Sequence, residues 1–460
     1  MDRSEDSAIV GHPCQVDEII DSQPVGRLQR RTIGLCCLIG ALNGFDGQVI
    51  GFLAPSMAES LHVDVRTFGP VFSAGFVGLM IGAMTMGPLG DRLGRKPALL
   101  ISTLTFGVLA GLTSVAQTLN SLLLIRFLTG LGLGGALPNI AALATEYVPK
   151  RLGRIPASLI GAAIPAGAMS AGLLATWMLP AWGWRSLFVL GGFMPIVLAG
   201  ILAVALPESP RHLSLHRRNQ AKLRVIMAKI WPDGVRLNAY FSAPNRSIAA
   251  GGSVLELFRR GRALITSMLW VANIMSFMVL YFIISWMPSL LAAAALPSSA
   301  GVMSITAFSL GGIMGSLSEG PLMNRFSPAL ILCGEFLVFA LLALVLALAP
   351  LTYGLVAVVA FGLGVSIQAA QAGLIIFAVT LYPTEIRSTG SGWSVAIGIV
   401  GSIVGPLLGG FAMLAGWTAQ GIFASGAVPA VTAAGAVAMI FGIEMKKGRQ
   451  RPTGPTQSPL

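Results

Sequence analysis

The stretches "GPLGDRLGRKPALL", residues 87–100, and "GPLMNRFSPAL", residues 320–330, decide how this chain folds. Their first glycines lie 233 positions apart. A second pair of similar stretches, "EYVPKR" and "LYPTEIR", places Tyr147 and Tyr382 235 positions apart. Two matches at nearly one offset, both with polar residues in register, indicate a duplication. We therefore expect the chain to consist of two similar halves.

Each half is rich in apolar segments that are long enough to cross a membrane. The 460 residues are 55% hydrophobic and only 10% charged, whereas a soluble domain is about 25% charged. Apolar runs of about 20 residues span a hydrocarbon core of about 30 Å, and they must be helical because lipid cannot satisfy backbone polar groups. We predict an all-α integral membrane protein with twelve transmembrane helices. They are expected near residues 32–55, 68–89, 98–117, 119–143, 155–179, 184–206, 263–289, 298–318, 328–349, 352–380, 390–414 and 419–442.

The positive charges predict the orientation of the chain in the membrane. Of the 30 Lys and Arg residues, 27 fall in the two tails and in the connections after even-numbered spans. Arg66 and Arg185 lie on the opposite side, and Arg126 lies inside the fourth span. Because positive loops stay in the cytoplasm, we expect both termini there. The net charge of +12 follows from this bias, so we predict no nucleic-acid partner.

The spans and connections predict the domain organisation. Two Pro-containing breaks, "WPDG" and "SAPN", interrupt a hydrophilic segment between the sixth and seventh spans. The predicted parts are a cytoplasmic N-terminal tail at 1–31, a six-helix bundle at 32–206, a cytoplasmic central loop at 207–262, a second six-helix bundle at 263–442 and a cytoplasmic C-terminal tail at 443–460.

The connection after the second span has the composition of a charge latch. Its glycines allow helix ends to approach closely, and Asp91 can accept hydrogen bonds from helix N-termini or from an arginine of a neighbouring helix. Such a contact can hold one conformation and release in another. A plain solvated turn is the alternative. The predicted gate residues in this stretch are Gly87, Gly90, Asp91, Arg92, Gly94, Arg95 and Lys96.

This stretch resembles the loop signature of the major facilitator superfamily, and the twelve spans and the duplication fit that family. The resemblance implies two pseudo-symmetric six-helix bundles. A narrower resemblance covers nearly the whole chain: "NGFDGQVIGFLAPSM", "RFLTGLGLGGALPNIAALATEYVPKR", "LPESPR" and "YPTEIRSTGSGW" look like the aromatic acid:proton symporter family. Its members take up benzoates, hydroxybenzoates and related acids together with a proton.

The chain departs from this family's pattern at three positions. Asn43 replaces the first aspartate of the usual first-span signature, and Asp46 matches the second. Ile399 falls where the family commonly has an arginine in span 11. Asn324 stands in the second half where the first half has Asp91. Substrate and coupling details are therefore left open.

Asp46 is the one Lys, Arg, Asp or Glu between Thr32 and Ala58. A charge at the centre of a membrane helix costs roughly 2.5–3.5 kcal/mol on insertion scales, so a partner or a proton must offset it. Asp46 lies on a different face from a stripe of four glycines that suits close helix packing. We predict that Asp46 and Asn43 face a central cavity and that Asp46 couples a proton to transport. A structural cap or ion pair within the bundle is the alternative.

Arg126 also needs a partner. Two interpretations compete: it pairs with Asp46 or Glu146 in one conformation, or it binds the substrate carboxylate, which guanidinium geometry suits. A third is that Arg126 lies near the outer surface and extends its side chain to water. Gln368 and Gln371 share one face of span 10 and are predicted to line the second-half wall of the substrate site.

The positions of four further charged residues in the spans and at their ends predict their roles. Glu146, Glu385 and Arg387 lie at predicted cytoplasmic helix ends and resemble family gate positions. Ordinary interfacial ion pairs are the alternative, and Glu146 is also the second candidate for proton coupling. Glu335 lies in span 9, which is expected to be peripheral, so a structural or near-interface role is predicted for it.

The predicted function is proton-coupled uptake of an aromatic carboxylate across a bacterial inner membrane. We find no nucleophile motif and no metal-ligand spacing, so no enzyme, cofactor or metal is predicted, and a proton gradient supplies the energy. The expected partners are a small aromatic acid, protons and the lipid bilayer, with the protein as a monomer. The alternative is an efflux antiporter, because "GSIVGPLLGG", residues 401–410, matches a pattern known from drug/proton antiporters, although there it belongs to span 5.

Overall fold

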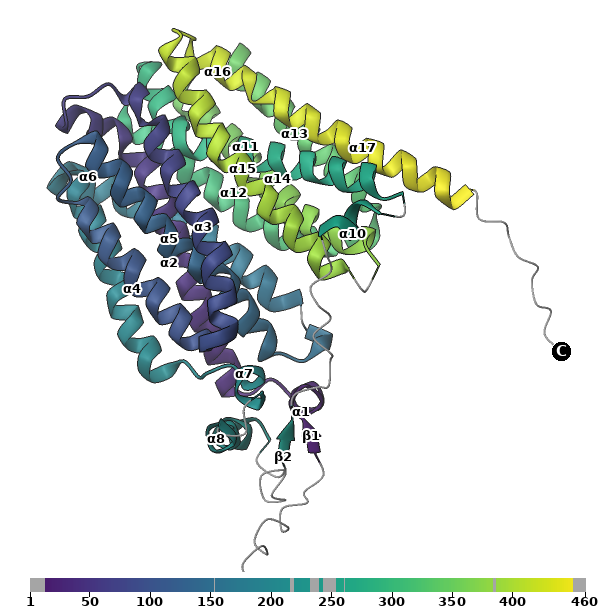
Figure 1. Cartoon of the computed structure of the whole chain (residues 1–460). Coiled ribbons are helices and arrows are strands. Elements are labelled where there is room, and N and C mark those ends of the chain that lie inside the picture. The colour runs from purple at the N-terminus through teal and green to yellow at the C-terminus, as the bar shows by residue number, and fades with distance from the viewer. Residues whose placement is uncertain are drawn as a thin grey trace, which may run out of the picture.

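The computed structural model describes residues 13–152, 154–215, 219–231, 240–242, 254–259, 261–383 and 386–449. Long helices form nearly all of it (Figure 1). The elements of the first half are β1 (Pro13–Gln15), α1 (Val16–Ser22), α2 (Arg27–Ser60), the 3-10 helix η1 (Val65–Phe68), α3 (Gly69–Leu93), α4 (Arg95–Thr113), α5 (Leu119–Glu146), the 3-10 helix η2 (Lys150–Leu152) and α6 (Arg154–Ala205).

The connection between the halves and the second half contain the remaining elements. The helices of each half pack mainly against one another, which forms the two predicted bundles. The connection holds α7 (Pro210–Ser214), α8 (Gln220–Ile230), β2 (Tyr240–Ser242) and α10 (Val254–Phe258). The second half holds α11 (Ala263–Ala293), α12 (Ser298–Arg325), α13 (Pro328–Leu348), α14 (Tyr353–Leu381), α15 (Arg387–Leu414), α16 (Ala419–Ser425) and α17 (Ala427–Arg449).

Helix α6 crosses the membrane twice. A Cβ atom on Gly44 would overlap the carbonyl oxygen of Ile164, and a Cβ atom on Gly191 would lie 3.0 Å from the ring of Phe45. Residues 164 and 191 therefore lie against neighbouring residues of α2, although a straight helix would separate them by about 40 Å. The chain reverses at Gly183, whose φ of 70° and ψ of 176° are not helical. Such a positive φ favours glycine.

The reversal in α6 confirms the prediction of twelve crossings. Among the described residues, eleven helices are long and apolar enough to cross a membrane, and α6 combines the predicted spans 155–179 and 184–206. The predicted span 419–442 is interrupted instead, because α16 ends before Gly426 and α17 follows it. Helices α2 and α17 also extend into the predicted tails, since a helix can continue past the hydrocarbon core into the interface.

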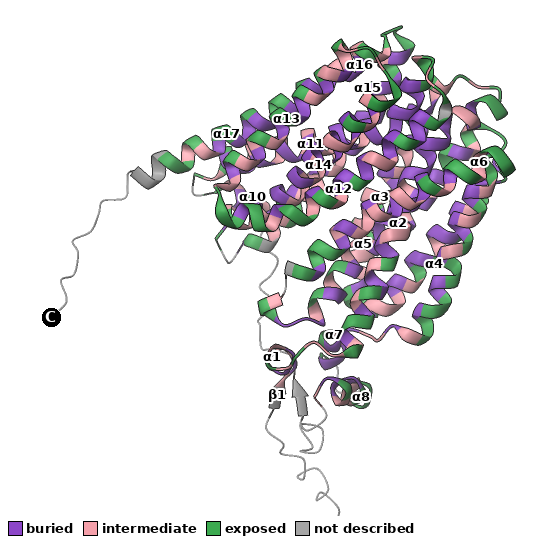
Figure 2. Cartoon of the chain, turned by 180° about the vertical axis from the view of Figure 1, so that it is seen from behind, coloured by how far each residue is buried: buried purple, intermediate pink, exposed green. Residues whose placement is uncertain are grey.

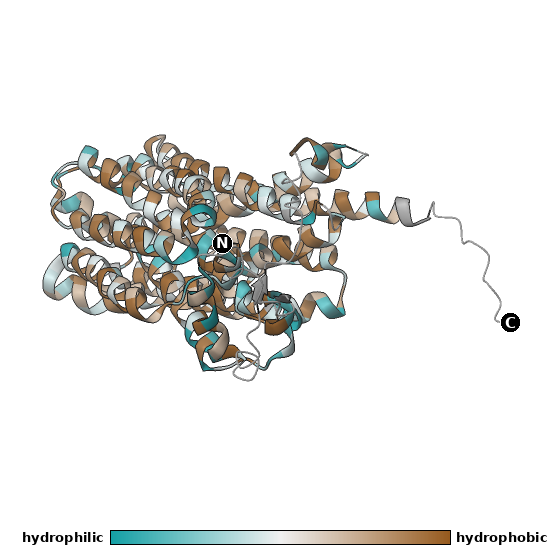
Figure 3. Cartoon of the chain, turned by 60° about the horizontal axis from the view of Figure 1, so that its bottom comes forward, coloured by the Kyte–Doolittle hydropathy of each residue, from teal (hydrophilic) through white to brown (hydrophobic). Residues whose placement is uncertain are grey.

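The outer surface of the bundles is apolar. The side chains of Trp177, Val204 and Leu348 are more than 80% exposed, and Figure 2 shows exposed residues along the outward faces of the helices. Hydrophobic residues cover most of the helical body in Figure 3. Soluble monomers rarely expose so much contiguous apolar surface. The protein is therefore a multi-pass membrane protein, with lipid in contact with this surface.

Helices α1, α7 and α8 lie together at one end of the molecule, called here the α1 end (Figure 1). The opposite end, called the α16 end, contains α16 and the C-terminal ends of α2 and α4. At the α1 end, β1 and β2 pair in parallel, with Cys14 opposite Phe241. The N-terminal segment is thus hydrogen-bonded to the connection between the halves.

Glycines let α2 and the first crossing of α6 approach at backbone distance. A Cβ atom on Gly167 would overlap the carbonyl oxygen of Ala41, as one on Gly44 would overlap that of Ile164. The predicted glycine stripe of α2 thus serves packing at Gly44 and at Gly51, which lies against Ile284 of α11. Gly47 differs, because nothing lies within 4 Å of its Cβ position.

We expect Gly167→Ala to lower the free energy of unfolding by about 1–3 kcal/mol, because the new methyl group would force α2 and α6 apart. Gly161→Ala on the same helix is the matched control, since nothing lies within 4 Å of its Cβ position. The control should be neutral or more stable by up to about 1 kcal/mol, as alanine favours helix. Melting of the purified variants measures both. Equal melting temperatures would contradict the backbone contact.

Candidate functional site

A buried ion pair joins α2 to α5. Arg126 Nη1 lies 3.2 Å from Asp46 Oδ2, and Nη2 lies 3.4 Å from Oδ1, so the two side chains meet fork to fork. The side chain of Asp46 is 1% exposed and that of Arg126 is 5% exposed. Each charge offsets the cost of burying the other. Arg126 is therefore the partner that Asp46 requires.

Two further side chains position the guanidinium group of Arg126. Nη2 donates a hydrogen bond to Thr113 Oγ1, at the last residue of α4, over 2.8 Å. The ring of Phe188, in the second crossing of α6, lies 5.1 Å from the guanidinium carbon. Arg126 thus points inward and does not extend to the surface, which rules out the third interpretation in this conformation. Its Nε is buried and has no hydrogen-bond partner within the described protein.

The ion pair lines a cavity between the two halves. The cavity has a volume of about 60 Å³, enough for a few water molecules at about 10–15 Å³ each. Asn43 also lines it and donates to the carbonyl oxygen of Leu133 over 3.1 Å. Gln48 was not predicted as a site residue. It lines the cavity, and its Oε1 is buried and without a partner among the described residues. A second amide two residues after Asp46 in an apolar span was the available signal.

Aromatic rings form the wall of the cavity between α3 and α11. The ring centroids of Phe76 and Tyr281 lie 4.3 Å apart. One turn towards the α16 end, Phe72 meets Trp286 edge to face at 5.3 Å. Phe72, Phe76 and Tyr281 all line the cavity. Polar groups from α2 and α5 therefore face aromatic surface contributed in part by the second half.

Contacts between the halves close the cavity towards the α16 end. Ser73 Oγ donates to the carbonyl oxygen of Ile403 over 2.7 Å. A Cβ atom on Gly69 would lie 3.1 Å from the carbonyl oxygen of Pro406. These contacts join α3 to α15 near their termini at that end. The cavity is thus sealed on this side by backbone-level packing.

The glycine pattern at 401–410 serves this packing. A Cβ atom on Gly405 would lie 2.5 Å from the carbonyl oxygen of Met278, and one on Gly410 would lie 3.4 Å from Gly69 Cα. Trp286 Nε1 donates to the carbonyl oxygen of Pro406 over 2.8 Å. The resemblance of this stretch to an antiporter pattern is therefore accounted for by contacts of α15 with α11 and α3.

The structure does not bring every predicted substrate residue to the cavity. Gln371 Nε2 donates to Ser276 Oγ over 3.1 Å and so joins α14 to α11. Gln368 packs against Gly312 of α12. Neither glutamine lines the cavity, and neither does Ile399. Glu146 is also remote, because it lies twenty residues after Arg126 on α5, about 30 Å along a helix.

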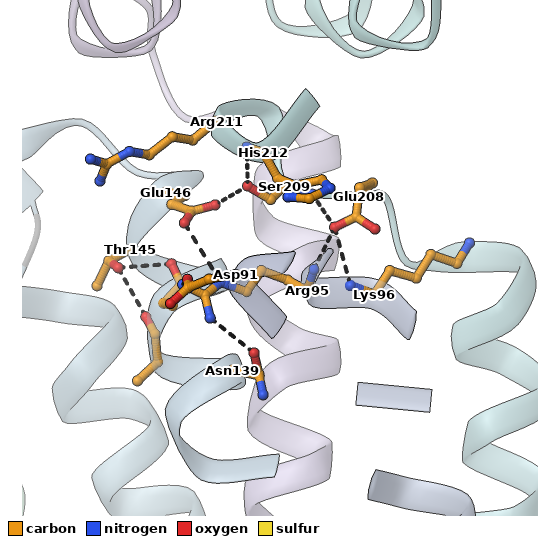
Figure 4. Close-up of polar contacts among 12 residues, drawn as sticks. Asp91, Arg95, Lys96, Asn139, Thr145, Glu146, Glu208, Ser209, Arg211 and His212 are labelled. Atoms are coloured by element: carbon orange, nitrogen blue, oxygen red, sulfur yellow. Dashed lines mark hydrogen bonds and ion pairs between the residues drawn. The ribbon is translucent and has the colours of Figure 1, made fainter. Parts of the chain in front are cut away.

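The predicted latch forms at the α1 end around Arg95 (Figure 4). Its Nη2 binds Asp91 Oδ1, its Nη1 donates to Asn139 Oδ1 over 3.0 Å, and its Nε lies 4.0 Å from Glu146 Oε1. Gly90 makes room for this cluster, since a Cβ atom there would overlap Asn139 Oδ1. The contacts tie together α3, α4 and α5, all of the first half.

Glu208, and not Asp91, accepts hydrogen bonds from a helix N-terminus. Glu208 Oε1 accepts from the backbone N–H groups of Arg95 at 2.8 Å, Lys96 at 3.2 Å and Ser209 at 2.8 Å. A Cβ atom on Gly94, whose φ is 106°, would lie 2.5 Å from Glu208 Oε2. Asp91 remains 66% exposed. Of the two contacts expected for Asp91, it makes the one with an arginine of a neighbouring helix, Arg95. Glu208 takes the helix N-terminus because the segment after α6 folds back over the start of α4.

The same segment binds Glu146. Ser209 Oγ donates to Glu146 Oε2 and accepts from the N–H group of His212 over 2.9 Å. Tyr147 Oη donates to the carbonyl oxygen of Glu208 over 2.7 Å. The "LPESPR" stretch therefore completes the latch (Figure 4). From the sequence this stretch stood out only as part of a resemblance, and no role was predicted for Glu208 or Ser209.

The other predicted gate residues lie at the same end. Lys96 Nζ donates to the carbonyl oxygen of Ala203 over 2.7 Å, Arg92 is exposed, and Gly87 faces Pro138 of α5. In the second half, Arg387 Nε donates to the carbonyl oxygen of Tyr382 over 3.4 Å. Glu385 lies outside the described residues.

Helix α1 contacts η2, the short helix that follows α5. Asp21 Oδ1 accepts from the backbone N–H group of Lys150 over 2.7 Å, and Oδ2 lies 2.9 Å from Lys150 Nζ. Burial acts to raise the pKa of Asp21, but the hydrogen bonds and charge of Lys150 outweigh it, so the pKa is lowered. This contact is therefore present above the usual pKa of an aspartate and is lost as pH falls below the lowered value.

We expect Glu208→Ala to lower the free energy of unfolding by about 1–3 kcal/mol, because three backbone N–H groups lose a charged acceptor. Glu59→Ala, an exposed acid at the α16 end, is the control and should change the value by less than about 0.5 kcal/mol. Thermal melting in detergent measures both. Equal effects would show that Glu208 does not support the latch.

Comparisons with known proteins agree with this architecture. Residues 36–406 match the sequence profile of the Major Facilitator Superfamily. The chain is 33% identical to the 4-hydroxybenzoate transporter PcaK of Pseudomonas putida, covering 94% of this chain and 96% of that one. It is 33% identical to a gallate transporter of Pseudomonas putida, covering 93% and 95%. A partially occluded inward open structure of the xylose transporter XylE from E. coli aligns with a TM-score of 0.68 at 15% identity, covering 94% of this chain and 100% of that one. The chain belongs to the major facilitator superfamily.

Proposed function

We propose that this protein imports an aromatic carboxylate together with a proton across the bacterial inner membrane by alternating access. The names of the relatives support an aromatic acid as the substrate, since they include transporters of 4-hydroxybenzoate and gallate. The distribution of 27 of 30 positive residues supports cytoplasmic termini. The observation that carries the proposal is the buried Asp46–Arg126 pair in the cavity.

Charge balance explains why the proton and the anion move together. With Asp46 ionised and Arg126 protonated, the pair has no net charge. A carboxylate entering alone would leave one uncompensated negative charge in a poorly hydrated cavity, which is costly. A proton on Asp46 removes that charge and releases Arg126 to pair with the substrate. The cavity therefore stays neutral when empty and when it holds both the proton and the anion.

Arg126 is suited to receive the substrate carboxylate. Its Nη atoms already bind one carboxylate in a two-pronged arrangement, which is the geometry that guanidinium groups favour. Its Nε, buried and without a partner among the described residues, offers a further donor. Thr113 and Phe188 hold the guanidinium group in place, so that it need not be reoriented when the carboxylate changes.

The opposite wall suits an aromatic ring. Phe72, Phe76 and Tyr281 present aromatic surface to the cavity, and aromatic rings favour offset or edge-to-face contact with other rings. The unpartnered Oε1 of Gln48 can accept a hydrogen bond from a ring hydroxyl. These features together favour a hydroxylated aromatic acid.

The size of the cavity supports alternating access. At about 60 Å³ it must widen to admit a substrate, and the contacts of α3 with α15 close it towards the α16 end. We propose that the first half moves against the second and that the latch around Arg95 and Glu208 keeps the ends of α3, α4 and α5 together during this movement. Glu146 belongs to the latch in this proposal, and proton coupling is assigned to Asp46.

We expect Asp46→Asn to abolish uptake of 4-hydroxybenzoate driven by a pH gradient, because the amide cannot take up and release a proton. Exchange of labelled for unlabelled substrate without a gradient should persist, since it needs no net proton movement. Vesicles with an imposed pH gradient measure the first process, and counterflow measures the second.

Asp64→Asn is the matched control for Asp46→Asn, because Asp64 is an exposed acid at the α16 end. The amount of each variant in the membrane is measured first, and uptake rates are compared at equal amounts. Near-normal gradient-driven uptake by the Asp46 variant would refute the coupling role and would move the assignment to Glu146.

Substitution of Gln48 by leucine tests the ring-hydroxyl contact. Loss of one hydrogen bond costs about 0.5–1.5 kcal/mol, so the half-saturating concentration for 4-hydroxybenzoate should rise about two- to tenfold. Benzoate, which has no ring hydroxyl, provides the internal control and should be affected much less. Competition of unlabelled acids against labelled substrate gives both values. An equal loss for both acids would place Gln48 away from the ring hydroxyl.

A further inference from the structure

Two acids of the second half, one buried and one half-buried, lie close together outside the cavity. Glu319 on α12 is fully buried, and neither of its carboxyl oxygens accepts a hydrogen bond from an N–H or O–H group of the described residues. Glu335 on α13 is half-buried, and its Oε2 is likewise without such a partner. The two carboxyl groups lie close enough to interact electrostatically.

The duplication supports this juxtaposition independently. At the offset of 233 positions, Met86 and Ser102 of the first half correspond to Glu319 and Glu335. A Cβ atom on Gly135 would lie 2.8 Å from Met86 Cγ and 2.5 Å from Ser102 Oγ, so these two side chains meet beside α5. The same place in the second half is therefore occupied by two acids.

The surroundings of the pair are apolar. A Cβ atom on Gly373 of α14 would lie 2.5 Å from Glu319 Oε1, 2.6 Å from Met323 Cε and 2.9 Å from Leu332 Cδ2. Gly373 thus makes room for the Glu319 carboxyl group against the backbone of α14. Residues of three helices, α12, α13 and α14, therefore surround the Glu319 carboxyl group.

No positive side chain from the neighbouring helices balances the two acids within the described part of the chain. Helices α11, α14 and α16 contain no Lys, Arg, Asp or Glu, and α13 contains only Glu335. On α12, Arg325 is exposed and lies six residues after Glu319, about 9 Å along the helix. The charged residues of α17 are Glu444, Lys446, Lys447 and Arg449, all ten or more residues after Ala434 and so about 15 Å or more farther along the helix. The first crossing of α6 has no charged residue between 155 and 183. Cys333 donates its thiol hydrogen to the carbonyl oxygen of Ala434.

Two ionised carboxylates cannot share this place. Like charges about 4 Å apart repel by about 4 kcal/mol even at an effective dielectric constant of 20, and burial in the membrane adds to the cost. One proton removes the repulsion, because a protonated carboxyl group can donate a hydrogen bond to its ionised neighbour. We propose that Glu319 and Glu335 form a proton-binding site that ties α12 to α13.

This site replaces a contact that the second half lacks. In the first half, Asp91 of α3 binds Arg95 of α4. At the corresponding positions the second half has Asn324 and Pro328, which cannot form an ion pair. Glu319 precedes the turn between α12 and α13, and Glu335 follows it, so the carboxyl pair lies on the same two helices. In this proposal an ion pair joins α3 to α4 in the first half, and a shared proton joins α12 to α13 in the second.

Infrared difference spectroscopy of the full chain in lipid nanodiscs tests the site directly. Raising the pH should remove an absorption of a protonated carboxyl group from the wild type. Glu319→Gln combined with Glu335→Gln should eliminate that change, and each single substitution should abolish or shift the band, because the surviving carboxyl group has lost its carboxyl partner. Glu59→Gln, an exposed acid at the α16 end, should leave the band unchanged.

Two results would overturn the site. The first is a pH-dependent carboxyl absorption that has the same position and intensity in the double variant as in the wild type. The second is an unshifted band in a single variant, at full or half intensity, which would show two acids that do not interact. Glutamine has nearly the same size as glutamate, and melting curves confirm that the variants are folded. The measurement needs no substrate, so its failure would leave the proposed transport function untouched.

Discussion

The buried pair of Asp46 and Arg126 is the interaction on which the rest of this structure depends. Either charge alone would cost several kcal/mol in the membrane. Together they join α2 to α5 beside the cavity, with Thr113 and Phe188 fixing the arginine. The pair also limits what the cavity can accept: an anion can enter without net charge only if a proton accompanies it. The same contact thus stabilises the first bundle and provides the coupling that we propose.

Backbone-level contacts at glycines determine how the helices around this pair are arranged. Gly44 and Gly167 bring α2 against α6, and Gly69 brings α3 against α15. At these glycines one backbone lies directly against another, so the helices within a half have little room to shift against each other. We therefore expect each half to move as a rigid body. The two halves are tied differently at the α1 end. The first uses ions and hydrogen bonds around Arg95 and Glu208, and the second places Glu319 opposite Glu335.

Much of the fold could be predicted because membrane helices and internal duplication leave strong local signals. Twelve crossings, the two bundles and the need of Asp46 for a partner all followed from apolar length and from the cost of an isolated charge. Glu208 was missed because its partners are backbone N–H groups more than 100 residues away, which no local pattern reveals. Gln368 and Gln371 were placed at the site because they share a helix face, but a helix between several neighbours can bury such a face against another helix.

The sequence by itself determined the membrane class, the number of crossings and the presence of two acids, Asp46 and Glu335, and one arginine inside apolar spans. Lipid excludes unpaired backbone groups and isolated charges wherever they occur in the chain. Only the tertiary structure decided that Arg126 pairs with Asp46 and not with Glu146, that Gln48 reaches the cavity, and that Glu208 caps α4. It also placed Glu319 against Glu335. These contacts depend on how helices distant in sequence rotate and cross, which is decided by packing at a few glycines and not by the composition of any one helix.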